Sequence, residues 1–302
     1  MTRWITLCAV ATLALAGCDG AVRGGGPRGG DAGAVPRDAG RADAAAAPPV
    51  DAGGGPAADA GGGPASDAGG PGVDAGGGGG ALDPPRGGSS GGTGGAAGVG
   101  GATMTASGTT YRLIVPSSYR AGTPTPLLVV YSGTEGGAVM TMNLMSLSGA
   151  GIIPGLATTI CAVLDGVTYR GDAAAGARVL DAVRAAYDVD NDRTYLLGES
   201  AGTTAALALG LHLRQSYFAA FWANDVNACD TPERTAAMLG FAPWGQAGPG
   251  GDLVDARCII DGMRTAGYRL DPVSPYAGPG STMHGSTDQF IAALSWFDAK
   301  SR

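Results

Sequence analysis

Residues 104–302 are predicted to form an α/β fold, a mostly parallel sheet with helices on both faces. Two observations predict this class. Short apolar runs of strand length alternate with longer amphipathic segments of helix length, and parallel strands need helix-sized connections between them. About 200 residues are enough for one core of this kind, so we expect a single globular domain.

The expected strands are marked by two kinds of pattern. The segment 110–115 alternates apolar and polar residues and stops at Pro116, whereas 126–131 is a continuous apolar run typical of a buried strand. The remaining strands are expected at 159–164, 193–197, 217–223, 236–242 and 270–273.

Helices are expected where apolar residues recur on one face of a helix. The segment 172–187 does this with Val179, Leu180 and Val183. The other expected helices are 139–147, 201–213, 253–266 and 286–297, and the last of them begins with a capping box made by Ser286 and Gln289.

Residues 1–17 resemble a bacterial lipoprotein signal peptide. Arg3 supplies a positive start, and 5–16 is an apolar run too short to span a bilayer. The segment Leu15-Ala16-Gly17-Cys18 matches a lipobox, which implies cleavage before Cys18 and lipid attachment to it. The chain would then be anchored to the cell membrane or outer membrane and face the periplasm or exterior. An ordinary secretory signal is the alternative.

Residues 18–103 are predicted to be a disordered linker. Gly, Ala, Pro and Asp dominate this segment, so it lacks the apolar surface whose burial would offset the entropy of ordering. Its Asp-Ala-Gly repeats are irregularly spaced and lack the apolar position of calcium-binding repeats. We therefore expect a flexible tether of roughly 50 Å reach.

Charge and composition argue against several partners. The net charge is −7, and no basic cluster indicates nucleic-acid binding. No His/Cys cluster has metal-ligand spacing and no glycine-rich phosphate loop follows a strand, so neither a metal nor a cofactor is expected. The oligomeric state is not indicated by the sequence.

The central motif is Gly198-Glu199-Ser200-Ala201-Gly202. It follows the apolar run 195–197 and precedes a long Ala/Leu segment that ends near Leu213. A serine nucleophile on a sharp strand-to-helix turn needs small neighbours, and the helix behind it points its positive end at the site. Because the chain holds 56 glycines, the motif gains its weight from this strand–turn–helix context.

Only one of the two histidines is placed to act as a base for this serine. His212 lies at the far end of the helix that starts at Ser200, about 18 Å along its axis. His284 lies in the loop before the final helix, after the serine in chain order, as a Ser-Asp-His hydrolase requires. His284 is therefore the predicted base.

These features together resemble the α/β-hydrolase superfamily, and in particular bacterial esterases of the polyhydroxybutyrate depolymerase and feruloyl esterase type. The resemblance covers about residues 105–300. It rests on 111–116, 126–130 and 165–167, and on 190–195 leading into the elbow. It implies a serine esterase that acts through an acyl-enzyme on small-molecule or polymer-borne esters.

The chain departs from this family's pattern at the turn after its second expected strand, where Ser132 replaces the usual histidine. The oxyanion hole of the family uses backbone N–H groups, so the resemblance assigns it to Ala201 together with Gly133 or Thr134. The Trp-Pro pair that often follows the histidine in depolymerases is also missing, which weakens a polyester assignment.

The acid of the catalytic triad is ambiguous, because 245–248 carries glycine where the family has its aspartate. Asp252 is the first candidate, since it follows a glycine-rich loop and precedes a helix, although it is equally suited to cap that helix. Asp225, at the end of the preceding strand, is the second. Glu199 is expected to be structural.

Three cysteines remain in the globular part. Cys161 is expected to be a buried free thiol, and Cys229 with Cys258 is a candidate disulfide whose geometry the sequence leaves open. Two alternatives to the esterase also stay open: a catalytically degenerate hydrolase-like lipoprotein that binds a ligand, and a peptidase or acyltransferase on the same scaffold.

Overall fold

The computed structural model describes residues 86–302. The predicted signal peptide (1–17), the lipidation site Cys18 and most of the predicted linker (18–103) lie outside the described residues.

Eight strands form one sheet in the order β1-β2-β4-β3-β5-β6-β7-β8. β1 and β2 are antiparallel to their neighbours, and every pair from β4 to β8 is parallel. The strands are β1 (Val99–Ala106), β2 (Thr109–Val115), β3 (Thr125–Tyr131), β4 (Ile160–Leu164), β5 (Val189–Glu199), β6 (Ala220–Asn224), β7 (Trp244–Gly248) and β8 (Arg269–Leu270). This order, with β2 antiparallel and the crossover between β3 and β4, is that of the α/β-hydrolase fold and confirms the predicted class.

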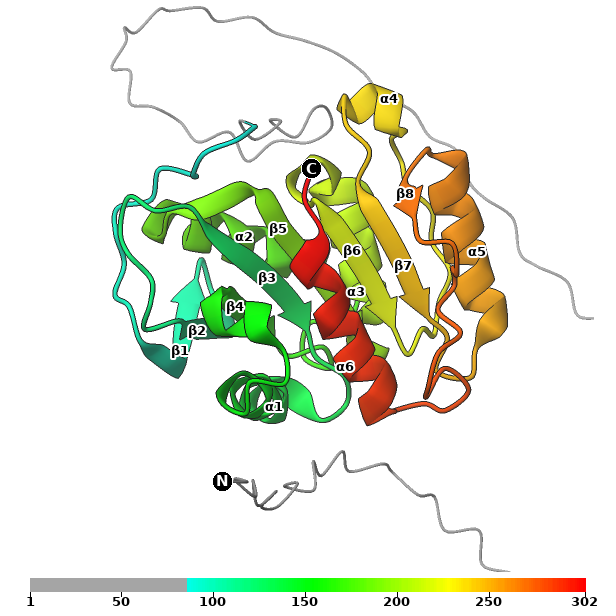
Figure 1. The fold of residues 1–302 in the computed structure, drawn as a ribbon, viewed down its shortest axis with the longest axis horizontal. Coiled ribbons are helices and arrows are strands. Elements are labelled where there is room, and N and C mark those ends of the chain that lie inside the picture. Colours follow the sequence, from blue (N-terminus) through cyan, green and yellow to red (C-terminus); the bar gives the residue numbers. More distant parts are fainter. Residues whose placement is uncertain (1–85) are drawn as a thin grey trace, which may run out of the picture. The chain divides into compact units, whose positions relative to one another are not determined.

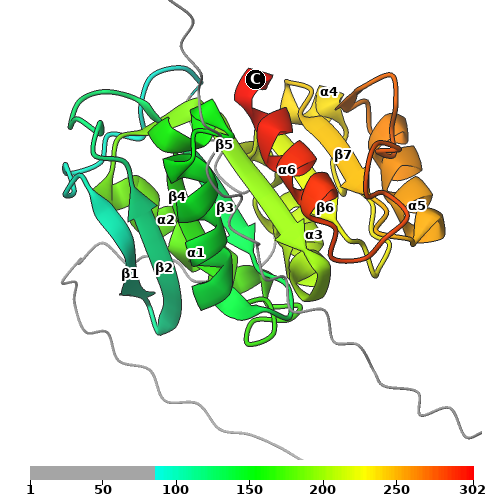
Figure 2. The ribbon, with the colours of Figure 1, turned by 60° about the horizontal axis from the view of Figure 1, so that its bottom comes forward.

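Helices cover both faces of the sheet (Figures 1 and 2), as the alternating pattern predicts. Helices α1 and α6 pack on one face, and α2, α3 and α5 pack on the other. The helices are α1 (Gly136–Gly149), α2 (Ala173–Ala186), α3 (Thr203–Ala208), α4 (Ala236–Leu239), α5 (Leu253–Thr265) and α6 (Thr287–Trp296). A π-helical turn over Leu209–Leu213 extends α3.

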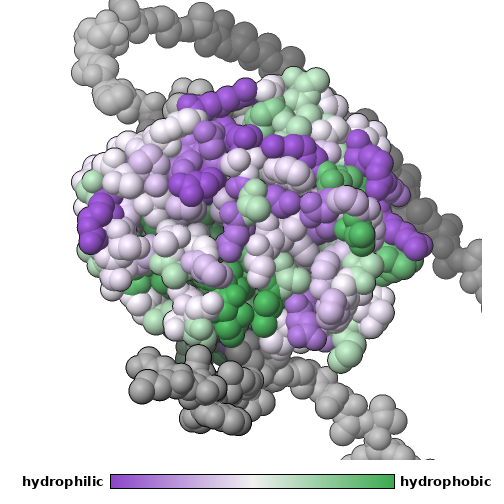
Figure 3. All heavy atoms as spheres, viewed as in Figure 1, coloured by the Kyte–Doolittle hydropathy of each residue, from purple (hydrophilic) through white to green (hydrophobic). Residues whose placement is uncertain are grey.

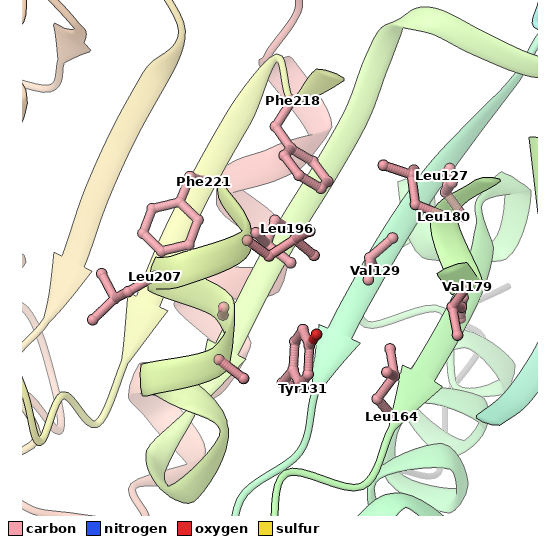
Figure 4. Close-up of a cluster of buried hydrophobic side chains, with 14 of the residues drawn as sticks. Leu127, Val129, Tyr131, Leu164, Val179, Leu180, Leu196, Leu207, Phe218 and Phe221 are labelled. Atoms are coloured by element: carbon pink, nitrogen blue, oxygen red, sulfur yellow. The ribbon is translucent and has the colours of Figure 1, made fainter. Parts of the chain in front are cut away.

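The apolar side chains of β3 point alternately to the two faces of the sheet and so contribute to two hydrophobic cores. Leu127, Val129 and Tyr131 point to the face covered by α2 and α3, as Figure 4 shows, while Leu128 and Val130 point to the face covered by α1 and α6. Successive side chains of a strand point to opposite faces. A strand buried on both faces must therefore be apolar throughout, which is why 126–131 reads as a continuous run.

The predicted strand at 236–242 is wrong. Ala236–Leu239 is the short helix α4, which Thr235 caps by accepting a hydrogen bond from the Met238 N–H and which Gly240 ends with a φ of 70°. The strand that pairs with β6 comes later, as β7. Its Gly-Gln-Ala-Gly sequence has the composition of a loop, and only burial between β6 and β8 makes it a strand. Of the predicted strand at 270–273, only Leu270 belongs to a strand, the two-residue β8.

The predicted boundary between linker and domain, at residues 103 and 104, falls inside β1 and was placed too late. Upstream of β1, the Ser90 hydroxyl lies 2.8 Å from the carbonyl oxygens of both Arg184 and Tyr187 and can donate its hydrogen to either. A Cβ on Gly92 would overlap the Tyr187 backbone. Small residues that are typical of a linker are here required by close packing.

The cysteine predictions have a clear outcome. Cys229 and Cys258 form a disulfide with a Cα–Cα distance of 5.8 Å, which lies in the usual range. It ties the loop after β6 to α5. Cys161 is a buried free thiol in β4, and burial raises its pKa to about 12, so it is held as the unreactive thiol.

Candidate active site

The strand register brings the chain segments that follow β3, β5 and β6 to one edge of the sheet. Tyr131 at the end of β3 pairs with Gly198, and Glu199 at the end of β5 pairs with Asn224 at the end of β6. The turns that follow these three parallel strands therefore leave the sheet side by side, at the edge where ligands bind in open α/β sheets.

Ser200 occupies the turn between β5 and α3 in a strained backbone conformation. Its φ is 46°, in the left-handed region that residues other than glycine seldom adopt. A Cβ on Gly202 would lie 2.6 Å from the carbonyl oxygens of Tyr131 and Ser132, so this position admits no side chain. The turn has the geometry of a nucleophile elbow.

His284 meets Ser200 at this edge. The Ser200 Oγ and His284 Nε2 atoms lie 2.8 Å apart, although 84 positions separate the two residues in the chain. With the proton on Nδ1, Nε2 is the acceptor for the serine hydroxyl. His212 is bonded elsewhere, with its Nε2 atom 2.8 Å from an Asp230 carboxylate oxygen.

The Asp225 carboxylate is fully buried beside the histidine loop. One oxygen accepts a hydrogen bond from the N–H of Gly285, the residue after His284, and the other accepts one from Gln289 Nε2 at 2.7 Å. Asp225 also has a positive φ, of 49°. It therefore joins the end of β6 to the histidine loop and to α6.

Asp252, the first candidate for the triad acid, lies in a different environment. Its side chain is exposed and accepts a hydrogen bond from the Asp255 N–H at 3.0 Å, as the N-cap of α5. Among residues 86–302, the Asp252 carboxylate has no hydrogen bond to the histidine loop, whereas Asp225 has one. The structure thus places the Asp225 carboxylate at the histidine loop, whereas the free N–H groups at the start of α5 hold Asp252 as a cap.

The turn after β3 holds two candidate oxyanion donors, the N–H groups of Gly133 and Thr134, and their hydrogen bonding differs. The Gly133 N–H donates to Glu135 Oε1 at 2.9 Å, whereas the Thr134 N–H has no partner among the described residues. A Cβ on Gly133 would lie 3.3 Å from the Ser200 Cβ, so this turn is next to the nucleophile. Thr134 is thus the donor with free capacity, and Ala201 is buried in the elbow itself.

Glu199 is a buried acid behind the elbow. Its carboxyl accepts a hydrogen bond from Asn224 Nδ2 at 2.8 Å, and Asn224 Oδ1 in turn accepts one from Trp222 Nε1 at 2.9 Å. Burial, and then the charge of Asp225, raise the pKa of Glu199 well above its usual range. The expected structural role of Glu199 thus includes direct electrostatic contact with Asp225.

Sequence reasoning missed three residues that build this site. Gln289 donates its N–H to Ser286 Oγ as the capping box predicts, but its side chain contacts Asp225 and accepts from the Gly250 N–H at 3.2 Å. Asn227 Nδ2 donates to the Ser200 carbonyl oxygen at 2.8 Å. Glu135 is the third. Only the capping signal of Gln289 pointed to any of them, and it pointed to a different role.

No metal site or membrane-spanning helix occurs within the part of the chain that the structure describes. No group of three or more His, Cys, Asp and Glu side chains in 86–302 is placed to hold a metal ion. Over the same residues, none of the helices combines the length and apolar character that crossing a bilayer requires.

The sheet order, the strained serine turn and the Ser200–His284 pair together define an α/β-hydrolase fold with a nucleophile elbow. No protein-family model and no curated protein matches the sequence.

Several solved structures are similar to the chain. A thermostable esterase is 15% identical, with a TM-score of 0.45, and the match covers 67% of this chain and 62% of that one. A poly(3-hydroxybutyrate) depolymerase from Bordetella parapertussis is 18% identical with a TM-score of 0.44, over 65% of this chain and 87% of that one. A ferulic acid esterase from Anaeromyces mucronatus is 12% identical with a TM-score of 0.42, over 66% and 89%. At such low values, conclusions about chemistry rest on the geometry of the site.

Replacing Glu199 by glutamine should make the protein more stable at high pH relative to the unchanged chain. Because the folded-state pKa of Glu199 is raised above its ordinary value of 4.5, its contribution is fully present below that value and is lost as pH rises through the folded-state pKa. The glutamine stays uncharged and keeps an oxygen for Asn224. Melting temperatures at pH 5, 7 and 9 should diverge by several degrees. Parallel curves, like those expected for the exposed control Glu233→Gln, would contradict this.

Proposed function

We propose that the protein is a serine-dependent carboxylic ester hydrolase. The observation that carries the proposal is the 2.8 Å contact between Ser200 Oγ and His284 Nε2 at a strained strand-to-helix turn. In the first step Ser200 attacks the ester carbonyl carbon while His284 takes the hydroxyl proton. His284 then gives this proton to the leaving alcohol, and the acyl group remains on Ser200.

Water completes the reaction. His284 takes a proton from a water molecule that attacks the acyl carbon, and Ser200 regains its proton as the acid product leaves. In both steps negative charge develops on the carbonyl oxygen. The N–H groups of Thr134 and Ala201 are the proposed donors to this oxygen, which backbone groups stabilise without having to reorganise.

Asp225 is the proposed acid of the triad. Its burial and its hydrogen bond to the Gly285 N–H support this role, because a buried carboxylate next to the histidine loop favours the imidazolium that forms during the reaction. Asp252 is the proposed cap of α5 and has no part in the chemistry.

The decisive experiment compares residues 86–302 with the Ser200→Ala variant. Hydrolysis of short-chain p-nitrophenyl esters should fall by at least about 10³-fold in the variant, and labelling by a fluorophosphonate should disappear. Equal signals from both proteins, or none from either, would leave a ligand-binding protein as the better description. Labelling of Ser200 without ester hydrolysis would favour a peptidase or an acyltransferase.

The acid is identified by comparing Asp225→Asn with Asp252→Asn. The first change removes the charge that stabilises the imidazolium, so kcat should fall by roughly 10³- to 10⁴-fold. The second removes only a helix cap, with a stability loss of about 1 kcal/mol and kcat within a few-fold of the unchanged chain. Melting curves recorded beside the kinetics separate unfolding from lost catalysis. The opposite ranking of the two kcat values would restore Asp252 as the acid.

We also propose that Cys18 carries a lipid that anchors the protein to a bacterial membrane. The support is the lipobox at residues 15–18 behind a positive start and a short apolar run. In a bacterial host, the full-length chain should incorporate labelled palmitate and fractionate with membranes, and Cys18→Ser should abolish both. Palmitate incorporation by the variant would refute lipidation at this cysteine.

A further inference from the structure

A carboxylate lies beside the nucleophile without a part in the proposed chemistry. Glu135 reaches back over the turn after β3, so that its Oε1 atom accepts the Gly133 N–H at 2.9 Å. A Cβ on Gly133 would touch both this carboxylate and the Ser200 Cβ. Glu135 is therefore held a few atoms from the serine, and it remains partly exposed to solvent.

The charges around Glu135 have one sign. The ionisable neighbours that act on it are Asp165 and Asp225, and those that act on Glu199 are Asp225 and Glu135. All of these neighbours are carboxylates. The carboxylates of Glu135, Asp165 and Asp225 thus give the surroundings of Ser200 a negative field, and low-dielectric surroundings strengthen such a field.

The space next to Glu135 is narrow and partly apolar. A cavity of about 10 Å³ between α1 and α6 is lined by Glu135 and Glu199, with Met140, Asn143 and Phe290 among the other lining residues. Figure 3 shows hydrophobic residues gathered on the surface between these two helices. This volume has room for about one water molecule, so a charged group of a substrate would meet the partly exposed Glu135 carboxylate from the solvent side and would not enter the cavity.

We propose that Glu135 is a specificity-determining residue that selects esters with a small positively charged group near the scissile bond and disfavours esters with an anionic group there. The inference rests on the proposed esterase function and adds a substrate class to it. A cationic group of the ester is attracted by the partly exposed Glu135 carboxylate beside Ser200. An anionic group of the same size meets only repulsion and the loss of its hydration.

A substitution can remove the charge of Glu135 and still keep its hydrogen bond to the turn. Glu135→Gln keeps an oxygen that accepts the Gly133 N–H, whereas Glu135→Ala removes the acceptor as well. Burial raises the pKa of Glu135, so assays at pH 8 favour the ionised form of the unchanged chain. Glu233→Gln removes the same unit of net charge from an exposed position and serves as the matched control.

The test uses three p-nitrophenyl esters whose acyl chains have equal length and end in a trimethylammonium, a tert-butyl or a carboxylate group. The first two have nearly the same shape, and all three form the same oxyanion. Any effect of a substitution on the oxyanion turn is common to the three esters and cancels in the ratios of their kcat/KM values. These ratios therefore report on charge at the site. Two unit charges about 6 Å apart at an effective dielectric constant near 40 give about a tenfold preference.

The unchanged chain and Glu233→Gln should prefer the trimethylammonium ester over the tert-butyl ester by about tenfold and should cleave the carboxylate ester slowest. In Glu135→Gln and Glu135→Ala this preference should shrink to about twofold. A preference that is absent in the unchanged chain, or that persists in both Glu135 variants, overturns the inference while ester hydrolysis itself stands. If no ester is cleaved and a neutral fluorophosphonate does not label Ser200, the proposed function fails instead.

Discussion

The pairing of β3, β5 and β6 at their carboxyl ends is the constraint on which the site depends. Once Glu199 and Asn224 are partners in the ladder, the next residue of each strand, Ser200 and Asp225, must leave the sheet at the same level. Both do so with positive φ. Two adjacent strands thus end in the same strained way, and strain of this kind persists where surrounding contacts determine the backbone fully.

The contacts that hold this arrangement are mostly hydrogen bonds to buried carboxyl groups. Asp225 has no exposed surface, and burying a charge is costly unless it is paired or hydrogen-bonded. Its two oxygens accept from Gly285 and Gln289, and the raised pKa of Glu199 favours a neutral partner behind it. Two ionised acids so close together would repel each other, and a protonated Glu199 removes this repulsion behind the elbow.

The sequence predicted the parts of the site that local pattern specifies. The apolar run before Ser200, the small residues around it and the chain order of His284 are local signals, and they located the elbow and its histidine. The acid depends on which strand lies beside which, and β7 was hidden because Gly245-Gln246-Ala247-Gly248 lacks the apolar character of a strand. Without that strand in place, the sequence favours Asp252, which follows a glycine-rich loop and precedes a helix, over Asp225 at the end of the preceding strand.

The same limit applies at the start of the domain. β1 is built from Val99-Gly100-Gly101-Ala102-Thr103 and the residues up to Ala106, and it becomes a strand through pairing with β2. Gly92 is needed because Tyr187 packs on it, a contact between residues 95 positions apart. A flexible tether and a tightly packed segment can have the same glycine-rich composition, so composition alone could not place the boundary between linker and domain.

The departure at Ser132 has a structural explanation that bears on the oxyanion turn. Its hydroxyl is fully buried, accepts the Gly166 N–H at 3.1 Å and donates to the Gly133 carbonyl oxygen at 3.3 Å. It thereby ties the turn after β3 to the turn after β4, where the Asp165 carboxylate accepts the Gly137 N–H at 3.1 Å. Side chains of Ser132, Glu135 and Asp165 thus hold the backbone on both sides of Thr134, whose N–H has no partner among residues 86–302. A turn held in this way needs no histidine side chain to present the proposed oxyanion donor, because that donor, the Thr134 N–H, belongs to the backbone.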